Sequence, residues 1–233
     1  MVLERLSDGA SGHSLVPDED ARKLIFILCL PLVDGVFATL LVTGAVETFS
    51  DIVAVGLTVF AGAGALAVLY SASKNRQEAV GLVKQAAPYL ILGAVLVSLV
   101  APIYEQLFYI SRLRYAAGLA LLTIAMKMGG IKIADKLSVP AILITGLMLS
   151  VRNPGSLAFS LNYVAPAVAT VTVALAALYG ASRLNVSRMD LNYIRKGGAL
   201  VLTFIALSMY GLEIPSELGL AVFALSVVAS YRN

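Results

Sequence analysis

The sequence predicts an all-α fold, a polytopic membrane bundle of about eight transmembrane helices, on three observations. Of its 233 residues, 59% are hydrophobic and only 13% are charged, and the mean hydropathy is +0.89, as is typical of membrane proteins. Eight apolar segments follow one another along the chain. Basic residues gather in every second connection between them. A single transmembrane domain, residues 22–233, is therefore expected after a polar tail, residues 1–21.

The tail is rich in Ser, Gly, Asp and Glu and has no apolar period, so we expect it to be flexible. Each apolar segment after it is bounded by polar or charged residues. About 20 apolar residues cross a bilayer as a helix, and shorter cores are extended by snorkelling Lys and Arg side chains. The predicted spans are residues 24–46, 52–73, 86–103, 108–128, 137–151, 157–181, 197–212 and 215–231.

The second span contains the small residues Ala61-Gly62-Ala63-Gly64-Ala65. Small residues let helices approach closely in lipid, so such Gly/Ala-rich faces are expected to pack helices together and to support a homo-oligomer.

An internal repeat is also predicted. A shift of 109 residues lays Pro31 on Pro140 and Ala65–Ser73 on Ala174–Ser182, with seven of these nine positions identical. The halves, approximately residues 24–131 and 137–231, would each hold four spans. An even number of spans gives both halves one orientation, so a parallel 4+4 repeat about an axis along the membrane normal is expected.

The basic residues predict which side of the membrane each connection faces. In the eight-span arrangement, every Lys and Arg except Arg112, Arg114 and Arg152 falls on one side. Connections rich in Lys and Arg stay in the cytoplasm. The prediction is a multi-pass plasma-membrane protein in the lipid bilayer with both termini cytoplasmic.

Composition excludes several classes of function. His13 is the only histidine and Cys29 the only cysteine, which argues against a metal site or an intrachain disulfide. The sequence has no HExxH motif, no P-loop and no pair of intramembrane aspartates, so we expect neither an enzyme nor a cofactor. The scattered basic residues indicate topology, so no nucleic-acid partner is predicted.

The first span carries the main candidate site. Asp34 is its only interior charge, and Pro31 and Gly35 lie beside it. Proline and glycine together favour a kinked or broken helix, whose freed carbonyl groups and carboxylate suit a cation or a proton. In the alternative interpretation, Asp34 only forms a hydrogen bond to a neighbouring helix, and Pro31 only bends the span.

The second half offers further candidate residues. Position 143 is Leu, so the carboxylate of the first half is not repeated, and the nearest polar group is Thr145. Asn153 and Pro154 follow in a polar break between two spans. The break is either a tight loop with Pro154 starting the sixth helix, or a re-entrant turn at which Asn153 faces an anionic or zwitterionic substrate.

Three strings carry a resemblance to a known family: residues 30–37 (LPLVDGVF), residues 112–115 (RLRY) and residues 139–146 (VPAILITG). They resemble an uncharacterised family of multi-pass membrane proteins typical of halophilic archaea. The resemblance implies an archaeal plasma-membrane protein and no particular function. Asn153-Pro154 is also similar, over this short motif, to the LysE-type amino-acid exporters. Those proteins have six spans in two three-helix repeats, whereas this chain predicts four plus four.

Two functions follow as hypotheses. The first is a small secondary transporter or permease for an ion or small polar solute, in which Asp34, Thr145, Asn153 and the kinks at Pro31 and Pro140 form a midplane cavity. The alternative is a non-transporting scaffold or accessory subunit, in which the Gly/Ala face of the second span docks a partner.

Overall fold

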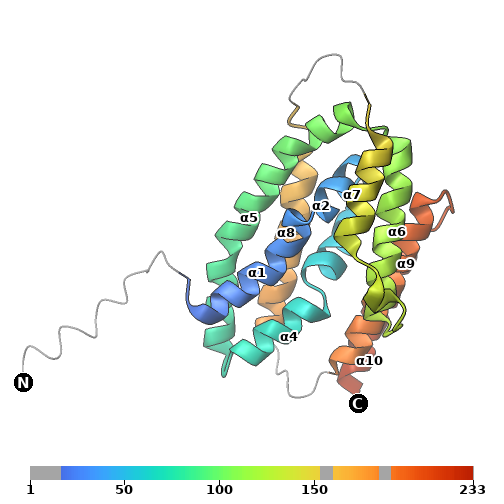
Figure 1. Ribbon diagram of the computed structural model, residues 1–233. Coiled ribbons are helices and arrows are strands. Elements are labelled where there is room, and N and C mark those ends of the chain that lie inside the picture. The colour runs from blue at the N-terminus through green and yellow to red at the C-terminus, as the bar shows by residue number, and fades with distance from the viewer. Residues whose placement is uncertain (1–16, 153–159, 184–189, 233) are drawn as a thin grey trace, which may run out of the picture.

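The computed structural model describes residues 17–152, 160–183 and 190–232, and this part of the chain is a helical bundle (Figure 1). The all-α prediction is thereby confirmed. A π-helical turn, η2 (Gly56–Phe60), and a short 3-10 helix, η3 (Ala134–Lys136), accompany the α-helices. The α-helices are α1 (Glu19–Val33), α2 (Val36–Val42), α3 (Phe49–Val55), α4 (Ala63–Ala72), α5 (Arg76–Leu107), α6 (Ile110–Met128), α7 (Val139–Ser150), α8 (Val164–Ser182), α9 (Leu191–Met209) and α10 (Ser216–Arg232).

The chain runs back and forth between two ends of the bundle. At the lower end in Figure 1, helix α1 begins, α4 meets α5, α6 ends before α7, α8 ends before α9, and α10 ends. We name this the basic end, because its connections hold most of the Lys and Arg residues. The upper end, named the acidic end, carries Glu47, Glu105 and Glu213 together with Arg112 and Arg152.

Length and composition identify fewer spans than the eight predicted. Helices α5 and α8 are each long and apolar enough to cross a membrane, and the bent pairs α1–α2 and α3–α4 raise the number to four if each pair is one span. Helix α7 and residues Glu217–Ser230 of α10 are apolar but shorter. Helix α6 has 19 residues but carries Arg112, Arg114 and Lys127 near its two ends.

Helix boundaries differ from the apolar boundaries where polar caps extend a helix. Helix α5 begins at Arg76, ten residues before the predicted span, because the Asn75 side chain accepts a hydrogen bond from the Glu78 amide at 2.9 Å. Helix α9 begins at Leu191 instead of residue 197, and its cap Asp190 accepts from the Asn192 amide at 2.9 Å. Helix α8 begins at Val164, later than the predicted residue 157.

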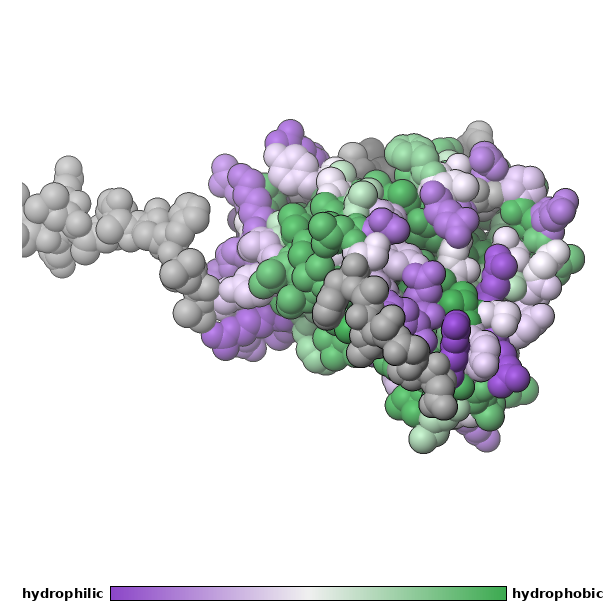
Figure 2. Space-filling view, turned by 90° about the horizontal axis from the view of Figure 1, so that it is seen from above, coloured by the Kyte–Doolittle hydropathy of each residue, from purple (hydrophilic) through white to green (hydrophobic). Residues whose placement is uncertain are grey.

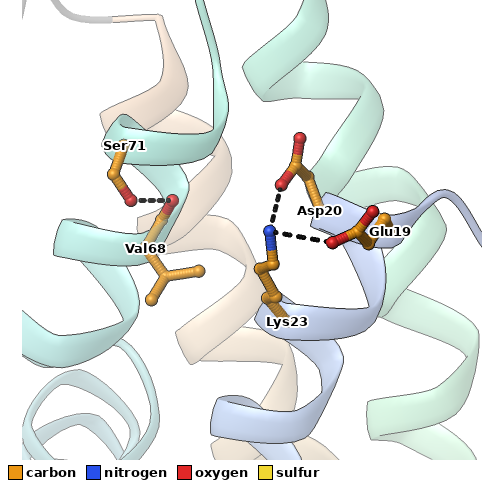
Figure 3. Close-up of polar contacts among 5 residues, drawn as sticks. All are labelled: Glu19, Asp20, Lys23, Val68 and Ser71. Atoms are coloured by element: carbon orange, nitrogen blue, oxygen red, sulfur yellow. Dashed lines mark hydrogen bonds and ion pairs between the residues drawn. The ribbon is translucent and has the colours of Figure 1, made fainter.

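Helix α1 likewise begins inside the predicted tail, at Glu19. Glu19 and Asp20 lie in its first turn, where their negative charges interact favourably with the positive end of the helix dipole. The Lys23 ammonium lies 3.4 Å from the Glu19 carboxylate and 3.0 Å from that of Asp20. Figure 3 shows these ion pairs beside α4, where the Ser71 hydroxyl donates to the Val68 carbonyl. Helix α1 therefore starts more than one turn before the apolar segment predicted from residue 24.

Close helix packing depends on glycine at several crossings. A Cβ atom on Gly146 of α7 would lie 2.1 Å from the Ala116 Cβ of α6, and one on Gly197 of α9 would lie 2.0 Å from the Ser226 hydroxyl of α10. Helix α5 packs against α1, α2 and α8, while α6 packs against α7 and α9. Ala61, Ala63 and Ala65 of the predicted Gly/Ala face are buried inside the chain.

The acidic end of α7 is tied to the junction between α5 and α6. The Tyr109 amide donates to the Ser150 carbonyl and the Arg152 amide to the Leu107 carbonyl, each at 2.7 Å, which forms an antiparallel bridge between Phe108 and Val151. Apart from this tie, α7 packs mainly along α6.

The two segments matched by the 109-residue shift meet at the basic end. Ala65–Ser73 lies in and after α4, and Ala174–Ser182 lies in α8. The Tyr70 hydroxyl donates to the Ala181 carbonyl at 3.2 Å, which joins one segment to the other. The helix contacts of the described residues do not follow the repeat, because α9 packs extensively on α10, whereas the corresponding α5 does not pack extensively on α6.

Candidate functional site

The chain breaks at Asp34 and Gly35, between α1 and α2, and turns there by 45°. Pro31 lies in the last turn of α1 and removes a backbone donor from it. Gly35 has a φ of 81°, a left-handed conformation that other residues adopt at a cost of about 1–2 kcal/mol. The break expected from Pro31 and Gly35 is therefore present, and it is centred on the single interior carboxylate.

The Asp34 side chain is half-buried and binds a backbone amide at the start of α2. Its Oδ1 atom accepts a hydrogen bond from the Val36 amide at 3.0 Å, which provides a partner for one amide at the start of the helix. This bond is local, whereas the alternative interpretation expected a bond to a neighbouring helix. This local hydrogen bond holds the carboxylate at the break between α1 and α2.

A second break lies beside the first and was not predicted. Helix α3 continues into the π-helical turn η2, and α4 then begins after Gly62 with a bend of 49°. A Cβ on Gly62 would lie 2.5 Å from the Thr58 carbonyl oxygen, so only glycine fits this close turn. The buried Thr58 hydroxyl donates to the Ala54 carbonyl at 2.6 Å. The closely spaced Gly56, Gly62 and Gly64 are the sequence signal for this break.

Both breaks line one cavity of about 640 Å³. Asp34 and Pro31 contribute to one wall, and residues 58–60 and 62–65 contribute to another. The ends of α6 and α7 near the basic end close the far side, and Arg195 of α9 reaches the cavity as well. The cavity thus lies between broken helices on one side and unbroken helices on the other.

Charged residues of both signs line this cavity. Asp34 is its carboxylate, while Lys127 at the end of α6 and Arg195 in the second turn of α9 are its cations. Lys127 is half-buried and Arg195 is exposed. Most other lining side chains are apolar, among them Ile27, Phe60 and Ile124. An apolar cavity with a few charged groups of opposite sign suits a small charged or zwitterionic molecule.

The remaining candidate residues are distributed differently. Pro140 lines the same cavity as Pro31, but it lies in the first turn of α7, where proline is tolerated, so it begins a helix and does not kink one. Thr145 lines a separate groove between α6 and α7, and its hydroxyl donates to the Ala141 carbonyl at 2.8 Å. Asn153 and Pro154 lie outside the described residues.

Sequence reasoning missed Lys127 and Arg195 as cavity residues. The sequence predicts both as topology signals, and Lys127 also as a snorkelling side chain that extends its span, because each lies next to a connection at the basic end. A basic residue that precedes or follows an apolar segment gives the same pattern whether it faces water or a cavity. Arg195 reaches the cavity because α9 packs beside η2 and α4, and this position depends on tertiary packing.

One known protein family matches this chain. Residues 90–210 match the family described as "Family of unknown function (DUF5794)", and this match covers more than half of the chain. The chain belongs to the DUF5794 family. The match begins within α5 and ends just after α9, so it includes Lys127 and Arg195 but not Asp34. The expected membership of an uncharacterised family is confirmed. Searches of the curated proteins and of the solved structures found no match.

Proposed function

We propose that this DUF5794 protein is a small secondary transporter or permease for a small polar solute. One observation carries the proposal: two helix breaks line a single cavity that holds Asp34 together with Lys127 and Arg195. Intramembrane carboxylates are costly in lipid and mark ion or substrate pathways. Broken helices that line a cavity are a recurring feature of secondary transporters.

The proposed membrane arrangement follows the course of the chain. The bent pairs α1–α2 and α3–α4 and the helices α5 to α10 make eight passes between the two ends, with the basic end in the cytoplasm. Figure 2 looks onto the acidic end, where hydrophilic and hydrophobic residues are mixed and hydrophobic patches lie at the margin. The proposal includes an archaeal plasma membrane and an ancestral four-plus-four duplication, which rest on the sequence resemblance and on the 109-residue match.

The lining charges favour a zwitterionic solute over a simple ion. A positively charged group, or a proton, binds at Asp34, and an anionic group of the same solute faces Lys127 or Arg195. Small amino acids carry charges of both signs. They are therefore the first class to test, with protons and alkali cations as coupling ions.

The experiment is solute flux into proteoliposomes, run with wild type and Asp34→Asn. Asparagine keeps an oxygen that accepts from the Val36 amide, so the helix break is retained while the charge is lost. We expect Asp34→Asn to abolish flux of the transported solute. Asp135→Asn is the matched control, because Asp135 is exposed and does not line the cavity. Flux that is equal in all three proteins would refute the role of Asp34.

The cations are tested with a second matched pair. Lys127→Gln removes a cavity charge, whereas Lys132→Gln removes an exposed charge near the same end of α6 that does not line the cavity. For a zwitterionic solute, Lys127→Gln is expected to raise the half-saturating concentration, while Lys132→Gln leaves it unchanged. An effect on flux only for Asp34→Asn would indicate a cation or proton alone.

A scaffold or accessory subunit is the second candidate. Helix α7 favours it, because Ile144, Met148 and Leu149 are exposed there. The Gly/Ala face first expected to dock a partner contains three alanines that are buried within the chain. A stable co-purifying protein, together with no solute-dependent rise in the thermal midpoint, would favour this function over transport.

A further inference from the structure

A second hollow lies on the surface, along the line where α6 and α7 meet. This α6/α7 groove has a volume of about 790 Å³ and runs from Lys136 near the basic end to Arg112 near the acidic end. Apolar side chains such as Leu119 and Ile142 form its middle. It shares only Ser138 with the candidate cavity, so it is a separate site.

Polar groups gather where the groove reaches the acidic end. The Arg112 guanidinium donates to the Leu149 carbonyl at 3.2 Å and lies 5.2 Å from the centre of the Tyr109 ring. Among the described residues, the ion pairs involve Lys23 alone, so Arg112 reaches the groove without a carboxylate partner. The rings of Tyr115 and Tyr210 lie against each other nearby in a tilted arrangement, with centres 5.8 Å apart. A fixed guanidinium without a counter-ion is suited to bind an anion.

One buried hydroxyl in the groove also has no partner. Ser150 is fully buried, and its Oγ atom makes no hydrogen bond within the described part of the chain. Ser150 lines the groove next to Leu149, whose carbonyl binds Arg112. A buried hydroxyl without a partner costs about 1–3 kcal/mol, and a bound group often explains one. This orphan hydroxyl is independent of Arg112 and indicates the same end of the groove.

We infer that the α6/α7 groove binds an anionic phospholipid, with the phosphate at Arg112 and an acyl chain along the apolar middle. The inference rests on the membrane location proposed above, but not on transport. Three features support this occupant: the apolar walls match an acyl chain, the unpaired guanidinium matches a phosphate, and tyrosines accompany Arg112, as at membrane interfaces. Arg112 also belongs to the three basic residues that depart from the distribution of all others.

The test measures binding of short-chain phospholipids to the delipidated, detergent-purified chain through the thermal midpoint. Dioctanoyl phosphatidylglycerol is the anionic probe, dioctanoyl phosphatidylcholine the zwitterionic one, and inorganic phosphate the headgroup alone. The anionic lipid is expected to raise the midpoint at concentrations where the other two do not. Arg112→Gln should weaken its binding by about tenfold or more, because one charge-assisted contact is lost.

Arg114→Gln is the matched control, because Arg114 lies on the same helix but does not line the groove. Its affinity for the lipid should equal that of wild type. Equal binding of both lipids, equal losses in both arginine variants, or stabilisation by inorganic phosphate alone would each overturn the inference. A concentration-dependent dimer in place of lipid binding would also overturn it, since a second copy would then cover the groove.

Ser150→Ala provides a readout that does not depend on the arginine variants. In the lipid-free protein this change removes an unpartnered hydroxyl, so the thermal midpoint should stay equal or rise. With the anionic lipid, the same variant should bind several-fold more weakly than wild type. A lower midpoint without lipid, with unchanged lipid affinity, would mean that Ser150 has a partner within the protein and would contradict the inferred site.

Discussion

At the scale of single residues, Asp34 combines two separable properties, a hydrogen-bond acceptor and a negative charge. Asp34→Ala removes both, and we expect it to lower the free energy of unfolding by about 1 kcal/mol, because the Val36 amide loses its partner. Asp34→Asn keeps the acceptor and should leave stability unchanged or raised. Thermal unfolding in detergent measures both. Equal losses in the two variants would show that the charge itself stabilises the fold.

Gly35 provides a second residue-scale prediction. Its left-handed backbone, with a φ of 81°, makes Gly35→Ala strained although no atom lies within 4 Å of the added Cβ. The expected loss of stability is about 1–2 kcal/mol. Gly64→Ala is the control, since Gly64 also has open space around it but lies in α4 with an ordinary φ. Equal stability of the two alanine variants would argue against the helix break at Gly35.

Residue chemistry that acts locally was predictable from the sequence. Pro31 and Gly35 act on their own backbone, so the break around Asp34 followed from spacing alone. The positions of Lys127 and Arg195 did not, because side chains 93 and 161 residues beyond Asp34 reach one cavity only through tertiary packing. Pro140 is another example. The sequence predicted a kink there, but Pro140 lies in the first turn of α7 and therefore starts a helix.

At the scale of elements, the contact between α6 and α7 depends on a glycine. Gly146→Leu places a side chain against Ala116, whose Cβ would lie 2.1 Å from the new Cβ. Overpacking of this kind costs about 1–3 kcal/mol, so the thermal midpoint should fall. Gly180→Leu in α8 is the matched control, because nothing lies within 4 Å of that Cβ. If both variants lose the same stability, the close packing of α7 on α6 is contradicted.

Element boundaries show why apolar segments and helices do not coincide. Apolar composition marks the part of a chain that avoids water, whereas a helix ends where its caps and dihedral angles end it. Asn75 and Asp190 therefore start α5 and α9 in polar sequence. The sequence did not predict the break between η2 and α4, because glycines that alternate with alanines indicate close helix packing. The alanines are indeed buried, but the glycines also allow the break.

At the scale of the whole molecule, the separation of charge between the two ends predicts orientation. The single native cysteine allows a direct test in intact cells, starting from Cys29→Ala. Glu213→Cys at the acidic end should react with a membrane-impermeant maleimide from outside, and Asp135→Cys at the basic end only after lysis. Both side chains are exposed, so access depends on the membrane alone. Labelling of Asp135→Cys in intact cells would contradict the proposed orientation and place the basic end outside.

The tie between α7 and the α5–α6 junction has a mechanical consequence. Helix α7 is fixed near Val151 by two short backbone hydrogen bonds, while its other end, at Pro140, borders the cavity. Twelve residues of helix form a lever of about 18 Å. A tilt of about 10° at the fixed end would thus displace Pro140 by about 3 Å, roughly the width of a water molecule. A small rotation at the acidic end would therefore move a residue of the cavity wall near the basic end.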